Sequence, residues 1–117
     1  MTTMSIILRK APYGSVDAPE AIRHALGGVN DDIAVNLIFM GSGVNAARRN
    51  QDISGTDYLS VEDGIRDCID MGVTVFAEGM ALDDEHISET DLIEGVQRAD
   101  LAKVGEVLNT SGTIMIF

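Results

Sequence analysis

Four short apolar runs that do not alternate with polar residues constrain the fold more than any other feature of this 117-residue chain. The runs cover residues 4–8, 33–40, 73–77 and 113–117. Runs of this length, rich in Val, Ile and Phe, are typical of strands that are covered on both faces. A parallel sheet with helices on either side provides such cover. We therefore expect an α/β fold in which all four strands are buried.

The segment between the first two runs has the pattern of a helix. It opens on Asp17-Ala-Pro-Glu20, where an acid at the N-cap, an early proline and a carboxylate three residues later form a capping-box pattern. We expect this helix to run to about Leu26 and to stop at the glycine pair that follows.

Two more helices are predicted further along the chain. The pattern over 60–71 begins with Ser60 as its N-cap, and the pattern over 100–108 carries apolar residues on one face. Shorter elements are expected as a helix at 45–50, a helical turn at 89–93 and a strand at 95–97. This order predicts a single domain over 1–117, a mostly parallel sheet of four or five strands flanked by helices, with right-handed crossovers.

The charge balance excludes several classes of protein. There are 19 acidic residues against 8 basic ones, and the formal net charge is −11. Nucleic-acid and anionic-membrane binders need clustered Lys and Arg, so neither partner is expected. The longest apolar stretches are too short to cross a bilayer, and the first residues lack the charged start and long apolar run of a signal peptide. We expect a cytoplasmic protein.

The single cysteine, Cys68, excludes an internal disulfide and a cysteine-built zinc site. It lies on the apolar stripe of the helix predicted over 60–71, where cysteine acts as a small hydrophobe. A reactive thiol needs exposure and a low pKa, whereas Asp67 and Asp70 would raise the pKa of Cys68. We therefore favour a structural role over a reactive one.

Candidate site residues follow three of the predicted strands. The carboxyl ends of parallel strands meet at one edge of a sheet, and ligand sites in open α/β sheets lie there. The loops expected at this edge span 10–15, 40–44 with the arginines behind them, and 78–80. The candidate lining residues are Tyr13, Ser42, Arg48, Arg49 and Glu78.

Each of these patterns has a simpler interpretation that we prefer. The glycine-flanked loop at 41–43 could bring backbone N–H groups to an anion, but a tight turn is favoured. Arg48 and Arg49 could clamp a carboxylate or phosphate, but a surface or inter-subunit ion pair is favoured. The run over 83–86 contains hard-metal ligand types, yet a solvated turn is favoured. His24 is interpreted as a helix-surface histidine, and neither a metal nor a cofactor is expected.

The whole chain resembles the DsrE/DsrF family of small sulfur-relay proteins, closest to the DsrF/TusC type. The resemblance rests on Ala11-Pro12-Tyr13-Gly14 after the first strand and on the glycine-containing loop at 40–44 after the second. It rests also on the Gly-Val strand over 72–78 and on the terminal apolar strand that ends in Phe117.

The resemblance implies a flavodoxin-like (DsrE-like) parallel sheet and subunits assembled as trimers or as hexamers of two trimers. It also implies a relay cysteine just after the third strand, which receives sulfur as a persulfide. In this chain that position is Glu78, and the Arg-Gly that often follows is Glu85-His86. A carboxylate cannot carry a sulfane sulfur, and Cys68 lies ten residues earlier in the preceding helix.

Three functional hypotheses follow. The first is a non-catalytic DsrE/DsrF-like subunit, accessory to intracellular sulfur transfer, that assembles with itself or with a cysteine-bearing paralogue. The second is a small-molecule-binding protein or enzyme that uses Glu78 in proton transfer or ligand contact. The third is persulfide chemistry at Cys68. We favour the first, so enzymatic activity is not expected.

Overall fold

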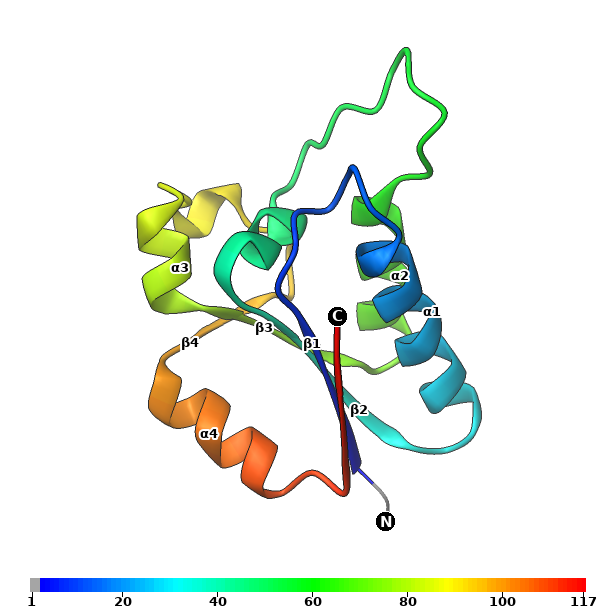
Figure 1. Cartoon of the computed structure of the whole chain (residues 1–117), viewed down its shortest axis with the longest axis vertical. Coiled ribbons are helices and arrows are strands. Elements are labelled where there is room, and N and C mark those ends of the chain that lie inside the picture. Colours follow the sequence, from blue (N-terminus) through cyan, green and yellow to red (C-terminus); the bar gives the residue numbers. More distant parts are fainter. Residues whose placement is uncertain (1–2) are drawn as a thin grey trace.

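The computed structural model describes residues 3–117 as a five-stranded sheet with helices on both sides (Figure 1). All four neighbouring strand pairs are parallel, and the spatial order is β4-β3-β2-β1-β5. The strands are β1 (Thr3–Leu8), β2 (Ala34–Phe39), β3 (Thr74–Glu78), β4 (Gln97–Ala99) and β5 (Thr113–Ile116). The predicted α/β class, the parallel sheet and the strand number are confirmed.

Helices cover the two faces of the sheet unequally. Helices α1 and α2 lie side by side on one face, and α4 alone lies on the other (Figure 1). The helical elements are α1 (Asp17–Asn30), η1 (Gly41–Ala47, a 3-10 helix), α2 (Val61–Asp70), α3 (Gly79–Asp84), η2 (Glu89–Asp91, also 3-10) and α4 (Leu101–Asn109). No helix within residues 3–117 is both long and apolar enough to span a membrane.

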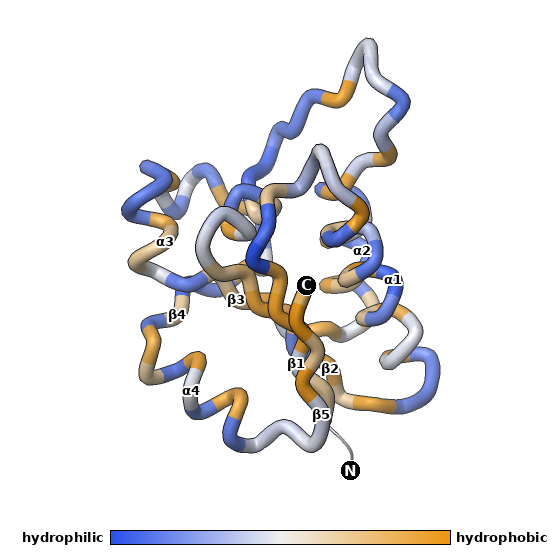
Figure 2. Tube along the Cα trace, in the orientation of Figure 1, coloured by the Kyte–Doolittle hydropathy of each residue, from blue (hydrophilic) through white to orange (hydrophobic). Residues whose placement is uncertain are grey.

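The core is divided by the sheet into a large and a small cluster. The large one joins the face of β1, β2 and β3 that carries Ile6, Leu37 and Val75 to the inner sides of α1, η1 and α2. The small one lies beneath α4 and contains Ile7, Ile38, Phe76, Ala99 and Val104. Tube colouring shows the apolar residues concentrated along the central strands (Figure 2).

The expectation that the last strand is buried is wrong. Among residues 3–117, β5 is an edge strand that pairs only with β1, and Ile114 and Ile116 are 46% and 58% exposed. Both lie on the face that α4 covers, because Ile116 is in register with Ile7. The cluster under α4 takes residues from β1, β2, β3 and β4 but none from β5, so this end of the sheet is left open.

The predicted bounds of the first helix need two corrections. Its N-cap is Val16, no side chain caps it, and Asp17 is the first residue of the helix. The Glu20 carboxylate pairs with Arg23 and so does not form the predicted capping box. The helix also continues through the glycine pair to Asn30. Gly28 lets the helix pack closely on the sheet, since a Cβ there would lie 2.8 Å from Val35 Cγ2 and 2.7 Å from Met4 Cε.

Other predicted elements are found with shifted bounds. Ser60 is the N-cap of α2, as predicted, and its Oγ accepts a hydrogen bond from the Asp63 N–H at 3.1 Å. The 45–50 helix is the 3-10 helix η1 at 41–47, and the short strand lies at 97–99 rather than 95–97. The segment expected to be a loop after β3 is helix α3.

Residues 41–43, for which we favoured a tight turn, are instead the first residues of the 3-10 helix η1, and Gly43 is critical for its packing. A Cβ at Gly43 would lie 2.1 Å from the backbone oxygen of Leu8 and 2.8 Å from its carbonyl carbon. The Gly43 N–H also donates to the Met40 carbonyl at 2.9 Å. Backbone cannot move aside as a side chain can, so η1 packs on the end of β1 only with glycine here.

We predict that Gly43→Ala lowers the free energy of unfolding by about 1–3 kcal/mol or more, the usual effect of overpacking a rigid site. Gly27→Ala is the matched control, because that helical glycine has nothing within 4 Å of its Cβ position. The control should raise stability by up to about 1 kcal/mol. Urea unfolding of both variants checks the pair; equal stability would contradict the packing argument.

Candidate functional site

The connections after β1, β2 and β3 meet at the carboxyl edge of the sheet, as parallel topology requires (Figure 1). Four of the five candidate residues form two groups at this edge, and Arg49, which donates to the Leu92 carbonyl, belongs to neither. Tyr13 and Arg48 surround Gln51, whereas Ser42 and Glu78 adjoin helix α3.

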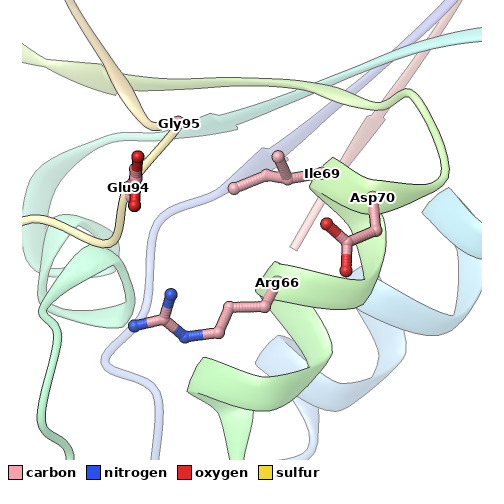
Figure 3. A pocket seen from close by; sticks show the side chains of 5 residues that line it. All are labelled: Arg66, Ile69, Asp70, Glu94 and Gly95. Carbon is pink, nitrogen blue, oxygen red and sulfur yellow. The ribbon is translucent and has the colours of Figure 1, made fainter.

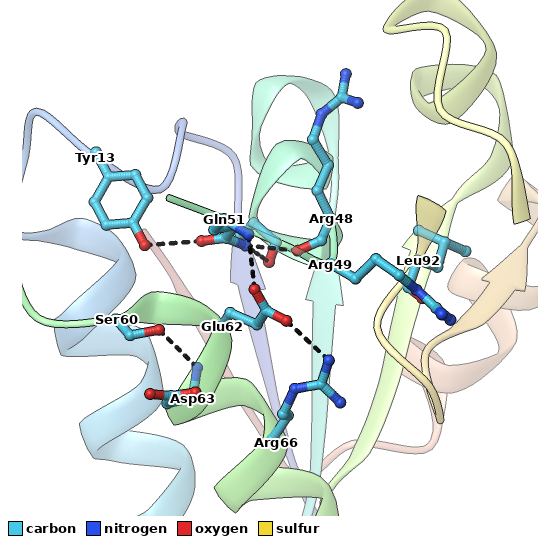
Figure 4. A network of polar contacts seen from close by, with 10 residues as sticks. Tyr13, Arg48, Arg49, Gln51, Ser60, Glu62, Asp63, Arg66 and Leu92 are labelled. Atoms are coloured by element: carbon cyan, nitrogen blue, oxygen red, sulfur yellow. Dashed lines mark hydrogen bonds and ion pairs between the residues drawn. The ribbon is translucent and has the colours of Figure 1, made fainter. Parts of the chain in front are cut away.

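Gln51 is the centre of the first group (Figure 4). The Tyr13 hydroxyl donates to Gln51 Oε1 at 2.8 Å and accepts from the Val61 N–H at 3.1 Å. Gln51 Nε2 donates to the carbonyls of Ala46 and Arg48 at 2.9 and 2.8 Å. The amide therefore ties the β1 loop, η1 and the start of α2 together, and it holds the Tyr13 hydroxyl in place.

Glu62 extends this network on the α2 side (Figure 4). Its Oε1 accepts the Gln51 N–H at 2.8 Å, and its Oε2 pairs with Arg66 at 2.8 Å. Burial disfavours the charged carboxylate, but hydrogen bonds from Arg66 and from the backbone outweigh burial, so the pKa of Glu62 is lowered. The charged form thus fastens the loop at 51 to α2.

The two arginines donate to backbone carbonyls. Arg48 reaches the Glu85 carbonyl at 3.0 Å as well as Asn45 Oδ1 at 2.9 Å, and Arg49 Nε reaches the Leu92 carbonyl at 2.7 Å. Within residues 3–117, neither arginine forms an ion pair with a carboxylate. The described residues therefore contain no ion pair of Arg48 or Arg49 within the chain, and an inter-subunit ion pair stays a prediction.

Glu78 is the N-cap of helix α3. Its Oε1 accepts the Met80 N–H at 2.9 Å and its Oε2 the Ala81 N–H at 2.8 Å. The residue is only 5% exposed. Both carboxylate oxygens thus satisfy backbone donors that would otherwise be unpaired at the start of the helix.

A second interaction fixes α3 against β4. The Arg98 guanidinium meets the Asp83 carboxylate through two contacts of 3.1 and 2.9 Å, and the hydrogen bond lowers the pKa of Asp83. The guanidinium lies directly over Gly79, where a Cβ would be 3.0 Å from it. Asp83, interpreted from sequence as part of a solvated turn, is in fact a helical residue with a defined partner.

Ser42 lines a small cleft of about 190 Å³ between η1 and α3. The other lining residues are Gly41, Ala81, Asp84 and Glu85. Ser42 therefore faces the helix that Glu78 caps, and two carboxylates stand beside it.

Cys68 is fully buried among the large core cluster, as the helix pattern predicted. Burial, with a smaller contribution from the charge of Asp67, raises the pKa of this thiol to about 11. At neutral pH the thiolate is scarce and inaccessible, which fits the structural role. His24, half-buried, has its Nδ1 2.8 Å from the Glu20 carbonyl and its ring 5.4 Å from that of Phe117.

Sequence reasoning missed the residues that organise this edge. Gln51 carried no signal, because a lone glutamine in an irregular loop has no pattern. Sequence reasoning also missed a cleft of about 370 Å³ beside Arg66, the residue that pairs with Glu62 (Figure 3). It lies between α2 and the turn before β4, with lining residues Arg66, Ile69, Asp70, Glu94 and Gly95.

Comparison with known proteins shows which family the chain resembles. The DsrE/DsrF-like family matches it over residues 3–117. It is 29% identical to the uncharacterized protein MJ0989 of Methanocaldococcus jannaschii, covering 97% of each chain. It is 28% identical to the intracellular sulfur oxidation protein DsrF of Allochromatium vinosum, covering 93% of this chain and 91% of that one.

Solved structures agree on the fold. The YchN protein of E. coli superposes with a TM-score of 0.91 at 22% identity over the whole of both chains. Protein MTH1491 of Methanobacterium thermoautotrophicum gives 0.77 at 16% identity, covering 98% of this chain and 99% of that one. With the family match spanning all described residues, the chain belongs to the DsrE/DsrF-like family.

Proposed function

We propose that this protein is a non-catalytic, self-assembling DsrE/DsrF-like subunit, accessory to intracellular sulfur transfer. The observation that carries the proposal is the state of position 78, where the resemblance to relay-competent members implies a cysteine. Here a buried carboxylate stands there, with both oxygens accepting backbone hydrogen bonds. That arrangement holds a helix in place and offers no sulfur acceptor.

The chain's one thiol supports the same proposal. Cys68 lies in α2 with no exposed surface, and its pKa is raised to about 11. Persulfide formation needs an accessible thiolate. The relative named as an intracellular sulfur oxidation protein supports a sulfur-transfer setting, in which a cysteine-bearing paralogue would supply the thiol.

A role for Glu78 as a catalytic base gains no support from the geometry. A general base must be within hydrogen-bond reach of a substrate proton. Both oxygens of this carboxylate are already engaged with α3, and the residue is 5% exposed. We therefore retain the subunit hypothesis.

Self-assembly is supported by the open part of the sheet. Ile114 and Ile116 extend the apolar face under α4 beyond the reach of that helix, and the outer edge of β5 has no neighbouring strand in the part of the chain that the structure describes. An uncovered apolar edge invites pairing or packing with another chain. We propose that copies meet here, as trimers or as hexamers of two trimers, inside the cell.

We predict that Ile116→Asp breaks this contact, because a charge would be buried against an apolar partner surface. Light scattering at micromolar concentration should give at least three times the mass of one chain for wild type and a smaller assembly for the variant. Met71→Asp is the control, because Met71 is also an exposed apolar residue (48%) but lies just after α2. This variant should have the same mass as wild type. A wild-type protein that is a single chain would refute self-assembly.

We also predict that wild type acquires no persulfide from a low-molecular-weight persulfide donor, while Glu78→Cys in a Cys68→Ala background does. The introduced thiol would face the N–H groups of Met80 and Ala81, which favour the thiolate. Its alkylation should have a pH midpoint well below the value of about 11 for Cys68.

Loss of the carboxylate cap should reduce stability by roughly 1 kcal/mol, so unfolding curves must confirm that the variant is folded during the assay. Mass spectrometry of the intact chains measures persulfide. Persulfide on Cys68 of native wild type would contradict the non-catalytic assignment. A thiol at position 78 as inert as Cys68 would show that this position is unsuited to relay chemistry.

A further inference from the structure

A second apolar surface lies on the opposite side of the sheet from the open face of β5. Helices α1 and α2 border a groove of about 270 Å³, and Leu59 stands at its rim. The apolar residues of the groove are Pro19, Ile22, Leu26, Val61 and Gly64. We call this surface, with Leu59, the α1–α2 groove.

Leu59 protrudes from this surface. It is 87% exposed, the largest fraction among the exposed large apolar side chains of residues 3–117. It ends the long irregular segment that leaves the body of the domain between η1 and α2 (Figure 1). Loops of this length without regular structure are uncommon in small domains unless they serve a function.

The residues on both sides of Leu59 are held in position. The ring centroids of Tyr58 and Tyr13 lie 5.3 Å apart. Ser60 caps α2, since its Oγ accepts the Asp63 N–H. The Val61 N–H donates to the Tyr13 hydroxyl at 3.1 Å. Because its neighbours are fixed, Leu59 is displayed in advance of binding, and little conformational entropy remains to be lost on docking.

The groove is formed by a glycine in the middle of a helix. Gly64 lies inside α2, where glycine is unfavourable relative to alanine. Its missing side chain lets Ile22 approach, since a Cβ there would lie 3.1 Å from Ile22 Cδ1. The depression beside this contact is lined by aliphatic side chains and accepts another of the same kind.

Charge distinguishes this groove from the two clefts described above. Each of those is lined by two carboxylates, whereas this groove is lined by none. Its one charged residue, Arg23, is balanced by Glu20 on the same helix at 2.6 Å. In a chain of net charge −11, a second copy meets the least repulsion at such a surface.

We propose that Leu59 of one copy inserts into the α1–α2 groove of a second copy, with the reciprocal insertion about a two-fold axis. A patch that contains both a protruding side chain and a recess of matching chemistry is self-complementary, which is the requirement for a two-fold contact. The contact rests on the self-assembly proposed above and adds a separate surface to it.

The experiment compares the masses of five proteins by light scattering. If β5 joins three copies and Leu59 pairs the trimers, wild type has six chains, Leu59→Asp three, Ile116→Asp two and the double variant one. Met71→Asp is the matched control and keeps the wild-type mass. Leu59 is so exposed that its replacement should not affect folding.

The outcomes separate the two contacts. A Leu59→Asp protein with the wild-type mass overturns the two-fold contact and leaves assembly through β5 standing. A wild-type dimer that Leu59→Asp reduces to a single chain, and that Ile116→Asp leaves intact, supports the two-fold contact and refutes assembly through β5. A single-chain wild type overturns both.

A mixing experiment tests the insertion itself. Leu59→Cys and Leu26→Cys chains are prepared separately, exchanged by dilution and reconcentration, and oxidised with diamide. The mixture should yield a disulfide that joins the two different variants, and neither variant alone should form this product. The buried Cys68 contributes no background. Absence of the mixed product, with both introduced thiols shown to be alkylated readily, overturns the proposal.

Discussion

A parallel sheet must be covered on both faces, and this requirement governs the rest of the structure. One face of the sheet receives α1, α2 and η1, while the other receives α4 alone. β4 and β5 lie at opposite edges of the sheet, and α4 connects them. The helix packs near β4, where it begins, and leaves Ile114 and Ile116 of β5 exposed. Residues 3–117 leave that end of the sheet uncovered, and this open face is the reason that we propose self-assembly there.

The carboxyl edge is built for rigidity. Glu78 begins α3, Arg98 clamps its far side through Asp83, and Arg48 holds its end through the Glu85 carbonyl. Among residues 3–117, no buried side-chain nitrogen or oxygen lacks a hydrogen-bond partner. A thiol at position 78 would accept hydrogen bonds far more weakly than a carboxylate does. The residue that stands at the proposed relay position is therefore also the N-cap that stabilises α3.

What the sequence predicts here is local. The apolar runs identify the strands, Ser60 identifies the start of α2, and helical spacing places Cys68 in the core. Helix α3 was missed because it opens with glycine and ends in acids, and its stability comes from contacts with other segments. The exposure of β5 and the role of Gln51 were missed for the same reason, since both depend on where distant segments pass in space.

Electrostatics links the two proposed contacts. At a net charge of −11, two copies repel each other over most of their surface, and salt confines this repulsion to separations below a Debye length of about 8 Å at physiological ionic strength. Both surfaces proposed to join copies, the open end of β5 and the α1–α2 groove, present aliphatic side chains. Contacts of this kind are driven by burial of apolar area, which screening does not weaken. We therefore expect added salt to strengthen the proposed assembly, whereas an interface held by ion pairs would loosen. Repulsion between the acids on the remaining surface would then disfavour contacts other than the two proposed here.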